Sequence, residues 1–369
     1  NLENAADAYE MIINRNESFT GILIKYNFSK KVNKRLELST GILIAEVPNI
    51  GFVGAGSFAQ GTLLPNMKGK CNFIGLASGR GNTAKYVGQK YGFEYCTPSA
   101  IELFNDDKIN TIFITTRHNM HAKDVINSIQ NGKHVFVEKP LAMNEEELLK
   151  IKINYEKLLK KGSQLNLMVG FNRRFAPPIQ QIKKMFEKEQ AKSINIRVNS
   201  GVLPVGHWIN DPEIGGGRII GEACHFIDLA MFLADSPIVS VAAESLKDTN
   251  KISNTVAINL KMENGSIASI CYFANGNKMV PKEFIEVFCG GTIAQVNDFK
   301  KLKVSGNKST NQKFKGLNKG HSACVQSFLS SISKGLECPI PFTESYISML
   351  ATFKVLKSIK ENRKIKITL

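Results

Sequence analysis

The sequence predicts an α/β fold in two parts: a doubly wound parallel sheet, followed by an α/β domain with a large open, mostly antiparallel sheet. Between residues 47 and 170, short apolar strands alternate with helical segments, which is typical of a parallel sheet covered by helices. After residue 171, longer strands follow one another through short turns. The length of 369 residues also fits two domains better than one.

The first domain, residues 47–170, has five expected strands, each short, apolar and rich in β-branched or aromatic residues. These strands are expected at residues 50–53, 73–77, 111–115, 134–137 and 167–171. Helices are expected between and after them, at about residues 57–68, 81–92, 99–106, 120–132 and 144–162.

The second domain, residues 171–369, is expected to be built mainly from longer strands. The segment Glu263–Asn264–Gly265 is a typical hairpin turn between two of them. The strands are expected at residues 193–203, 238–246, 254–262, 266–274 and 283–297, and the helices at about residues 218–234, 319–334 and 343–362.

Residues 1–46 form a leader with a different pattern. Residues 1–14 carry apolar side chains at helical spacing, residues 21–26 are expected to form a strand, and residues 27–40 are polar and basic, like a linker. One helix and one or two strands cannot bury a core alone. The leader is therefore expected to be a remnant of a larger unit. Its first residues have neither a signal-peptide pattern nor an initiator Met, which favours a truncated N-terminus.

The composition narrows the class of protein. No apolar run approaches the roughly 18 residues that span a bilayer, so no membrane partner is expected. The seven dispersed cysteines contain no CxxC pair, which favours a reducing, cytoplasmic location. The net charge of +16 indicates either a lysine-rich surface or a field that attracts anionic ligands. Nucleic acid is not expected as a partner, because no basic stripe with interleaved aromatic residues occurs.

A glycine-rich segment directly follows the first expected strand and opens the first helix. It has the form G-x-G-x-x-A. The first glycine allows a tight turn, the second leaves room for a pyrophosphate, and the alanine lets the helix approach the sheet, while amide groups at the helix start face the phosphates. This pattern predicts a Rossmann-type dinucleotide site formed by Gly54, Gly56, Ser57, Phe58 and Ala59.

The end of the second strand bears on the choice between the two nicotinamide cofactors. NAD sites usually carry an acidic residue at this point, to bind the ribose hydroxyls. This chain has Ser78, with Arg80 and Lys85 close behind. A hydroxyl and two cations suit a 2′-phosphate, so the sequence favours NADP(H) over NAD(H). The alternative is that both cations are solvated and NAD(H) binds through other groups.

Polar residues also follow the third and fourth strands, at the edge where open α/β sheets bind ligands. After the third strand, Thr115, Thr116, His118, Asn119 and His121 are candidate contacts to the cofactor, although either histidine could instead be a loop or capping residue.

The fourth strand ends at Glu138–Lys139–Pro140, since proline cannot continue a ladder. Glu138 and Lys139 are expected at the cofactor edge. A lysine beside a nicotinamide indicates hydride transfer on a polar substrate, and Lys139 is also a candidate to bind that substrate.

The junction between the two domains carries Asn172–Arg173–Arg174–Phe175. Asn172 and Arg174 are candidates to orient a hydroxyl-rich or anionic substrate, and Arg174 also to contact the cofactor. The alternative is an interdomain salt bridge. His207 is a weaker candidate for positioning the substrate.

A second dense motif runs from Gly215 to Asp228. His225 is the best candidate for general acid/base chemistry and a substrate contact, because imidazole titrates near neutrality. Glu222, three residues earlier, is expected to orient the His225 ring. No metal site is expected, because Glu222, His225 and Asp228 lack the i, i+4 spacing of helical zinc pairs. A structural helix with a satisfied histidine is the alternative.

These segments together resemble the Gfo/Idh/MocA oxidoreductases, over about 320 residues from residue 49 onward. The resemblance rests on the glycine loop, Glu138–Lys139–Pro140, residues 172–175 and the glycine block with His225. It implies an N-terminal Rossmann domain, and a C-terminal domain for substrate binding and oligomerisation. It implies NAD(P)-dependent oxidation or reduction at a carbon of a sugar, cyclitol or sugar nucleotide.

The resemblance also implies that Lys139 contacts the substrate hydroxyl and that His225 carries the proton. Two departures stand out: Ser78 replaces the usual acidic residue, and Gly221 replaces the usual Asp four residues before the histidine.

The leader is similar to the tail of a medium-chain alcohol dehydrogenase, in residues 3–10 and 21–26. This likeness implies that the chain is the C-terminal piece of a fused two-part oxidoreductase.

The sequence thus predicts an NAD(P)-dependent enzyme that acts on a small polyol or sugar-nucleotide substrate, as a homodimer or homotetramer. The rival interpretation is a non-catalytic dinucleotide sensor on the same fold.

Overall fold

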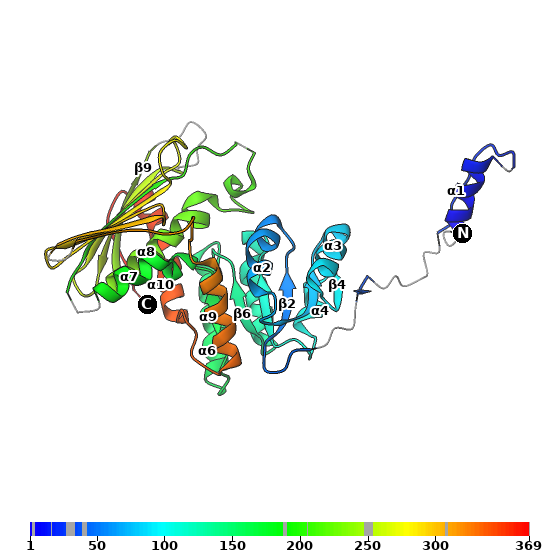
Figure 1. The fold of residues 1–369 in the computed structure, drawn as a ribbon, viewed down its shortest axis with the longest axis horizontal. Helices are drawn as coiled ribbons and strands as arrows, with labels where there is room; N and C mark the ends of the chain where they lie inside the picture. The colour runs from blue at the N-terminus through cyan, green and yellow to red at the C-terminus, as the bar shows by residue number, and fades with distance from the viewer. Residues whose placement is uncertain are drawn as a thin grey trace.

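The computed structural model describes residues 1, 4–15, 17–26, 34–38, 43–186, 190–204, 206–246, 254–306 and 309–368. Two sheets dominate it, one of seven strands and one of nine (Figure 1). Helices cover the first, and the second is mostly antiparallel. This arrangement confirms the predicted fold class.

The first sheet has the order β1-β4-β3-β2-β5-β6-β7. All its strands run parallel except the short edge strand β1, which pairs antiparallel with β4. Because the strands are parallel, the ends of β2, β3, β5 and β6 meet at one edge, where the glycine loop begins. The strands are β1 Leu36–Glu37, β2 Asn49–Val53, β3 Asn72–Ala77, β4 Tyr95–Thr97, β5 Thr111–Ile114, β6 His134–Val137 and β7 Leu167–Val169.

Helices connect these strands in the expected alternation, and β3, β5 and most of β2 and β6 are fully buried. The first helix, expected at 57–68, contains a π-helical turn, a form that often occurs at functional sites. The helices are η2 Ala59–Leu63, α2 Leu64–Met67, α3 Gly81–Tyr91, α4 Ala100–Phe104, α5 His118–Gln130 and α6 Glu145–Leu159.

The second sheet has the order β15-β14-β13-β12-β8-β11-β10-β9-β16, with only β8 and β11 parallel. Buried and exposed residues alternate along β10, so one face is packed and the other faces outward. The strands are β8 Ser193–Asn199, β9 Ile238–Ser245, β10 Val256–Met262, β11 Ile267–Phe273, β12 Glu283–Cys289, β13 Thr292–Asn297, β14 Lys301–Ser305, β15 Thr310–Lys313 and β16 Ile365–Lys366.

Helices α7, α8 and α10 pack against the second sheet, and α10 also packs against α6 and β7 of the first part. Helix α9 follows the second sheet in the chain, yet its Phe328 packs against Phe113 and Phe136 in the first core. The C-terminal region therefore ties the two parts together. The helices are η3 Asn172–Phe175, α7 Pro177–Met185, η4 Trp208–Asn210, η5 Ile219–Ala223, α8 Cys224–Ala234, α9 His321–Ser333 and α10 Phe342–Glu361.

The leader differs in part from expectation. Helix α1 (Ala5–Asn14) forms as expected and has no buried residue, and it lies apart from both sheets (Figure 1). The strand expected at 21–26 is wrong: these residues are irregular, and Leu23 is 98% exposed. Of the expected linker 27–40, residues 27–33 and 39–40 lie outside the described residues. The described part of it contributes β1, and Leu38 packs against Gly88.

Other differences concern short elements. The strand expected at 283–297 is two strands, β12 and β13, because Gly290 and Gly291 adopt positive φ and turn the chain. The helix expected at 218–234 begins as the π-helical turn η5. Five further elements, β4, β14, β15, β16 and α7, were not expected from the sequence, because they are short or lack a strong apolar period.

Candidate active site

The glycine loop lies at the carboxyl end of β2, tied to both neighbouring strands. The Gly54 amide donates to the carbonyl of Ala77 at the end of β3 (2.8 Å). Gly54 has φ +100°, and a Cβ there would lie 2.8 Å from the carbonyl oxygen of Thr115, so only glycine fits. A Cβ at Gly56 would meet nothing within 4 Å, which leaves the backbone open to a ligand. Ala59 is buried. These residues fit a dinucleotide phosphate site.

Phe58 and the end of β3 extend this edge. Phe58 is exposed, and its ring lies 5.7 Å from that of His321, the first residue of α9. Ser78 is half-buried and its amide donates to the Thr97 carbonyl (3.0 Å). Arg80 and Lys85 are both exposed, as are Gly56 and Ser57 of the loop. The structure thus places the cations close to the glycine loop, on the solvent side.

The segment after β5 is held mainly by backbone contacts. Thr115 Oγ1 donates to the Gly54 carbonyl (2.9 Å), which fixes the glycine loop, and Asn119 is exposed. His118 is buried, and its Nδ1 donates to the Gly215 carbonyl (2.8 Å). This bond ties the first domain to the glycine block of the second.

His121 is also buried, and both its ring nitrogens face backbone carbonyls. Nδ1 lies 2.7 Å from the Pro140 oxygen, and Nε2 lies 3.2 Å from the Thr116 oxygen. The neutral ring has one N–H and donates to one of these two carbonyls, so it lies between two loops of the edge. This corrects the expectation that His121 contacts a cofactor.

Lys139 extends from the end of β6 to the second domain. Its Nζ donates to the carbonyl oxygen of Gly221 in η5 (2.6 Å). Its neighbour Glu138 packs against Gly170, and burial raises the pKa of Glu138 to about 7. The Lys139 ammonium therefore lies one helical turn from His225, on the same side of the fold.

His225 is 7% exposed, and its ring lies 5.9 Å from that of Phe171. Its Nδ1 is buried and has no hydrogen-bond partner among the described residues. Burial lowers the pKa of His225 well below its usual value, and the charges of Arg173 and Lys139 lower it further. The imidazole is therefore neutral near pH 7.

Glu222 is not the partner of His225, which corrects the sequence expectation. Its carboxylate accepts from the Tyr272 hydroxyl (2.6 Å), from Ser200 Oγ (3.3 Å) and from Arg218 Nε (3.1 Å). Burial opposes ionisation of Glu222, but the charges of Arg218 and Lys282 outweigh it and hold its pKa at about 2. Arg218 and Tyr272 supply stronger partners than a neutral imidazole, so Glu222 turns toward β11.

Arg174 is a structural residue, which corrects its assignment to cofactor and substrate. Its guanidinium is buried and makes two hydrogen bonds to Asp228 (2.6 and 2.7 Å), and it also pairs with Glu344. A buried guanidinium needs such counterions, and these two carboxylates hold it in place. These ion pairs lie within the second part, next to the junction. Asn172 is buried as well, and its side chain donates to the Lys319 carbonyl (2.7 Å).

His207 lies at the rim of this region. Its Nδ1 accepts from the Ile209 amide (3.3 Å), and its ring lies 5.9 Å from that of Trp208. Trp208 in turn contacts His118, with ring centroids 4.7 Å apart. The Trp208 ring thus lies between His207 and the buried His118.

Several charged residues at the site were missed by the sequence analysis. Glu283 accepts two hydrogen bonds from Arg173 (2.8 and 2.9 Å) and one from Lys319 (2.5 Å). Lys282 lies 3.8 Å from Glu222, and His321 faces Phe58. These residues come from β12 and the start of α9, where no local motif marks them. Only the folded sheet brings them to His225.

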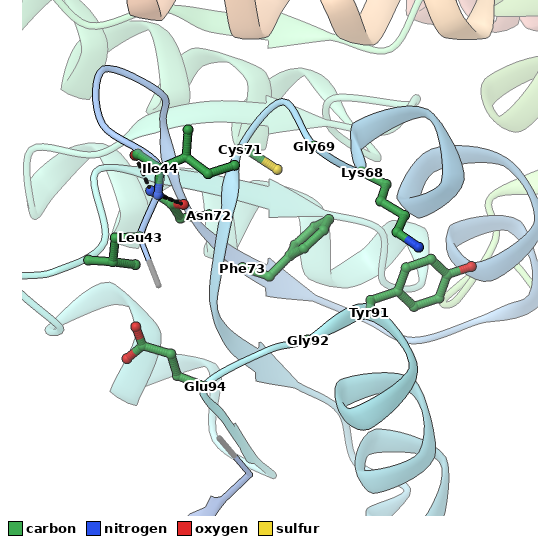
Figure 2. A pocket seen from close by; sticks show the side chains of 10 residues that line it. All are labelled: Leu43, Ile44, Lys68, Gly69, Cys71, Asn72, Phe73, Tyr91, Gly92 and Glu94. Atoms are coloured by element: carbon green, nitrogen blue, oxygen red, sulfur yellow. Dashed lines mark hydrogen bonds between the residues drawn. The ribbon is translucent and has the colours of Figure 1, made fainter. Parts of the chain in front are cut away.

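A cavity of about 170 Å³ lies elsewhere, at the amino end of the first sheet (Figure 2). There the Asn72 side chain pairs with the Ile44 backbone in both directions, accepting at 2.8 Å and donating at 2.9 Å. The cavity is a gap under the leader segment, at the end of β3 opposite the glycine loop. It is not part of the candidate active site.

The described residues contain no group of three or more His, Cys, Asp or Glu side chains placed to hold a metal ion. Within the same residues, no helix combines the length and apolar character that crossing a bilayer requires. All seven cysteines are described and are free thiols.

Two family models match the chain. Residues 48–171 match the model described as an oxidoreductase family with an NAD-binding Rossmann fold, and residues 180–290 match a GFO/IDH/MocA C-terminal domain. An uncharacterized oxidoreductase, YrbE of Bacillus subtilis, is 26% identical over 60% of this chain and 65% of its own length. The scyllo-inositol 2-dehydrogenase (NAD(+)) of the same organism is 30% identical over 43% of this chain and 45% of its own. The chain thus spans less than two thirds of each of these relatives.

Solved structures agree in fold. Levoglucosan dehydrogenase in complex with NADH and levoglucosan has a TM-score of 0.77 and 18% identity, over 87% of this chain and 100% of that one. A putative myo-inositol dehydrogenase from Sinorhizobium meliloti has a TM-score of 0.71 and 21% identity, over 87% and 100%. With both family models matched in order along the same two-sheet fold, the chain belongs to the Gfo/Idh/MocA family of oxidoreductases.

Proposed function

We propose that this protein is an NAD(P)-dependent dehydrogenase that acts on a secondary alcohol or ketone carbon of a sugar, cyclitol or sugar nucleotide. The observation that carries the proposal is the approach of Lys139 to the turn that precedes His225, at the edge that holds the glycine loop. Relatives named as scyllo-inositol, levoglucosan and trans-1,2-dihydrobenzene-1,2-diol dehydrogenases support the substrate class.

The chemistry assigns each group one task. A bound nicotinamide supplies the acceptor or donor of the hydride. In the oxidation direction, the C–H bond of the carbinol breaks and its electron pair leaves with the hydride. The hydroxyl proton passes to the neutral His225 imidazole. Lys139 hydrogen-bonds the same oxygen and favours its loss of the proton, with its ammonium held in place by the Gly221 carbonyl.

The test is a fluorescence titration of the protein with NADH and NADPH, followed by a turnover screen of sugars, cyclitols and sugar nucleotides. Lys139→Met should abolish turnover and leave the cofactor affinity unchanged within about threefold, since no phosphate contact is lost. Lys123→Met, on the exposed side of α5, is the matched control and should keep full turnover. Full activity of Lys139→Met would contradict the mechanism.

The choice of NADP(H) is the finer part of the proposal. Arg80 and Lys85 are exposed and follow the end of β3, the strand next to β2 and its glycine loop. Arg80→Ala should raise the KM for NADP⁺ by about tenfold and leave that for NAD⁺ unchanged, because a charge-assisted bond to a 2′-phosphate is lost. Equal KM values for NADP⁺ in both proteins would favour NAD(H) instead.

A second candidate function is the non-catalytic dinucleotide sensor. The observation that favours it is Glu222, which is bound to Arg218 and Tyr272 and leaves His225 without a carboxylate to orient it. A sensor would hold the cofactor tightly, and no sugar would reduce or reoxidise it.

The organisation of the whole protein is also a proposal. We infer a cytoplasmic homodimer or homotetramer that pairs through the outward face of the second sheet, where Ile267 is 51% exposed and Phe288 39%. The domain division at residue 170 and the likeness of the leader to an alcohol dehydrogenase tail stay predictions. Sedimentation analysis tests the assembly: a monomer at micromolar concentration would contradict it.

A further inference from the structure

Cations outnumber carboxylates around His225. The carboxylates Glu222 and Glu283 lie there with low pKa values, and Asp228, one turn further along α8, is paired with Arg174. Burial raises the pKa of the nearby Glu138 to about 7. Five cationic side chains surround them, which we call the cation cluster: Lys139, Arg173, Arg218, Lys282 and Lys319.

The hydrogen bonds show which of these charges are compensated. Glu283 forms ion pairs with Arg173 and Lys319, and Glu222 forms an ion pair with Arg218. Lys139 donates to a neutral carbonyl. Lys282 stands 3.8 Å from Glu222, beyond hydrogen-bond distance, and its side chain is 40% exposed. Two cations share the Glu283 carboxylate, and Lys282 shares Glu222 with Arg218, so positive charge is left over in the cluster. Of the five cations, Lys139 has no carboxylate partner and Lys282 has only the distant one.

His225 lies in the field of the same cluster. Arg173, Lys139, His321 and Lys282 all oppose its protonation, and burial opposes it most. The residue is more than nine-tenths buried, and its Nδ1 has no hydrogen-bond partner among the described residues. A buried polar atom without a partner costs free energy, and a bound ligand that supplied the missing hydrogen bond would recover this cost. An anion bound nearby would offset the field and strengthen His225 as a base.

We propose that the substrate carries an anionic group, a carboxylate or a phosphate on the sugar, and that Lys282 binds this group while Lys139 and His225 hold the reacting hydroxyl. The inference rests on the proposed function and narrows its substrate class to acidic sugars and sugar phosphates. Lys282 is then the residue that determines specificity. It acts through charge, so arginine can replace it and glutamine cannot.

The test compares neutral and acidic sugars of the same skeleton. The NADH-loaded protein is titrated by calorimetry with glucose, glucuronate and glucose 6-phosphate, and then with galactose and galacturonate. Turnover is measured with the same compounds and the oxidised cofactor. The variants are Lys282→Gln, Lys282→Arg and, as a control that removes the same charge from exposed β14, Lys303→Gln.

At least one acidic ligand should bind about tenfold or more tightly than its neutral counterpart, as a charge-assisted contact predicts. The preference should vanish in Lys282→Gln, persist in Lys282→Arg and Lys303→Gln, and weaken with added salt. A preference for glucuronate identifies a carboxylate, and one for glucose 6-phosphate a phosphate.

Three results would overturn the inference: equal binding of neutral and acidic sugars, no binding of any acid, or a Lys282→Gln variant that loses NADH affinity and not sugar affinity. The proposed function fails separately. Turnover of a neutral sugar without a preference for acids would support the dehydrogenase proposal and refute the anion site. Lys282-dependent binding of acids without any turnover would support the anion site and refute the dehydrogenase proposal.

Discussion

Two buried histidines near the edge that holds the glycine loop, here called the ligand edge, differ in their hydrogen-bond partners. His225 and His121 are both buried, but His121 has both ring nitrogens against carbonyls, while His225 leaves Nδ1 unpartnered among the described residues. The first is thus committed to structure and the second available for chemistry. Burial lowers the pKa of both. This shared shift has consequences for stability as well as for catalysis.

The pH dependence of stability tests the state of His121. Burial lowers its pKa to about 4, against a value of roughly 6.5 in an unfolded chain. Between these values the unfolded chain binds more protons, so stability falls as the pH falls. His121→Gln should remove about 2 kcal/mol of the loss between pH 7 and pH 5. Urea unfolding at both pH values measures this, and parallel losses in the two proteins would contradict it.

At the scale of elements, two π-helical turns lie beside the ligand edge, η2 after the glycine loop and η5 before α8. The turn η5 contains Gly221, whose carbonyl receives the Lys139 ammonium. A Cβ at Gly221 would lie 2.8 Å from His118 Cε1 and 3.0 Å from Ile209 Cδ1. His118 therefore fills the space that a side chain at 221 would need, which explains why this chain has glycine there.

Gly221→Ala should lower the free energy of unfolding by about 1–3 kcal/mol, the usual cost of overpacking, and should reduce turnover by displacing the Lys139 anchor. The cost should shrink when His118 is also replaced by alanine, in a double-mutant cycle. Gly61→Ala is the control, because a Cβ there meets nothing within 4 Å. A cost that is independent of His118 would show that the ring does not limit residue 221.

The elements also show what can be predicted from the sequence. The parallel sheet was predictable because βα alternation and the glycine loop are local patterns, and Lys139 was placed at the edge by the proline that ends β6. The partner of Glu222 could not be predicted, because Tyr272 is 50 residues away in the sequence, on β11. Lys282 and His321 were missed for the same reason. Burial of Arg174 depends on Glu344, from a helix 170 residues later.

At the scale of the whole molecule, buried ion pairs brace the start of the second part, next to its junction with the first. Arg174 in η3 links Asp228 of α8 to Glu344 of α10, and α9 returns to the first core. Arg173 links the same turn to Glu283 of β12. The junction therefore holds the second sheet in a defined position next to the ligand edge, with little freedom for the arginines to contact ligands.

Arg174→Met should lower the free energy of unfolding by about 3–5 kcal/mol, because it leaves Asp228 buried without its counterion. Arg363→Met, which breaks an exposed pair with Glu361, should cost about 0–1 kcal/mol. Urea unfolding of both variants measures the difference. A stable Arg174→Met variant with weakened cofactor binding would show that Arg174 contacts the cofactor.

The central claim is that Lys139 and His225 act together on one substrate oxygen beside a bound nicotinamide. The most direct test is single-turnover absorbance at 340 nm with saturating cofactor and substrate, for Lys139→Met, His225→Asn and the double variant. Residues that act as a unit lose their effects non-additively. The account predicts that each single variant is severely slowed and that the double variant is no slower than the slower single one. Normal hydride transfer in either single variant would contradict it.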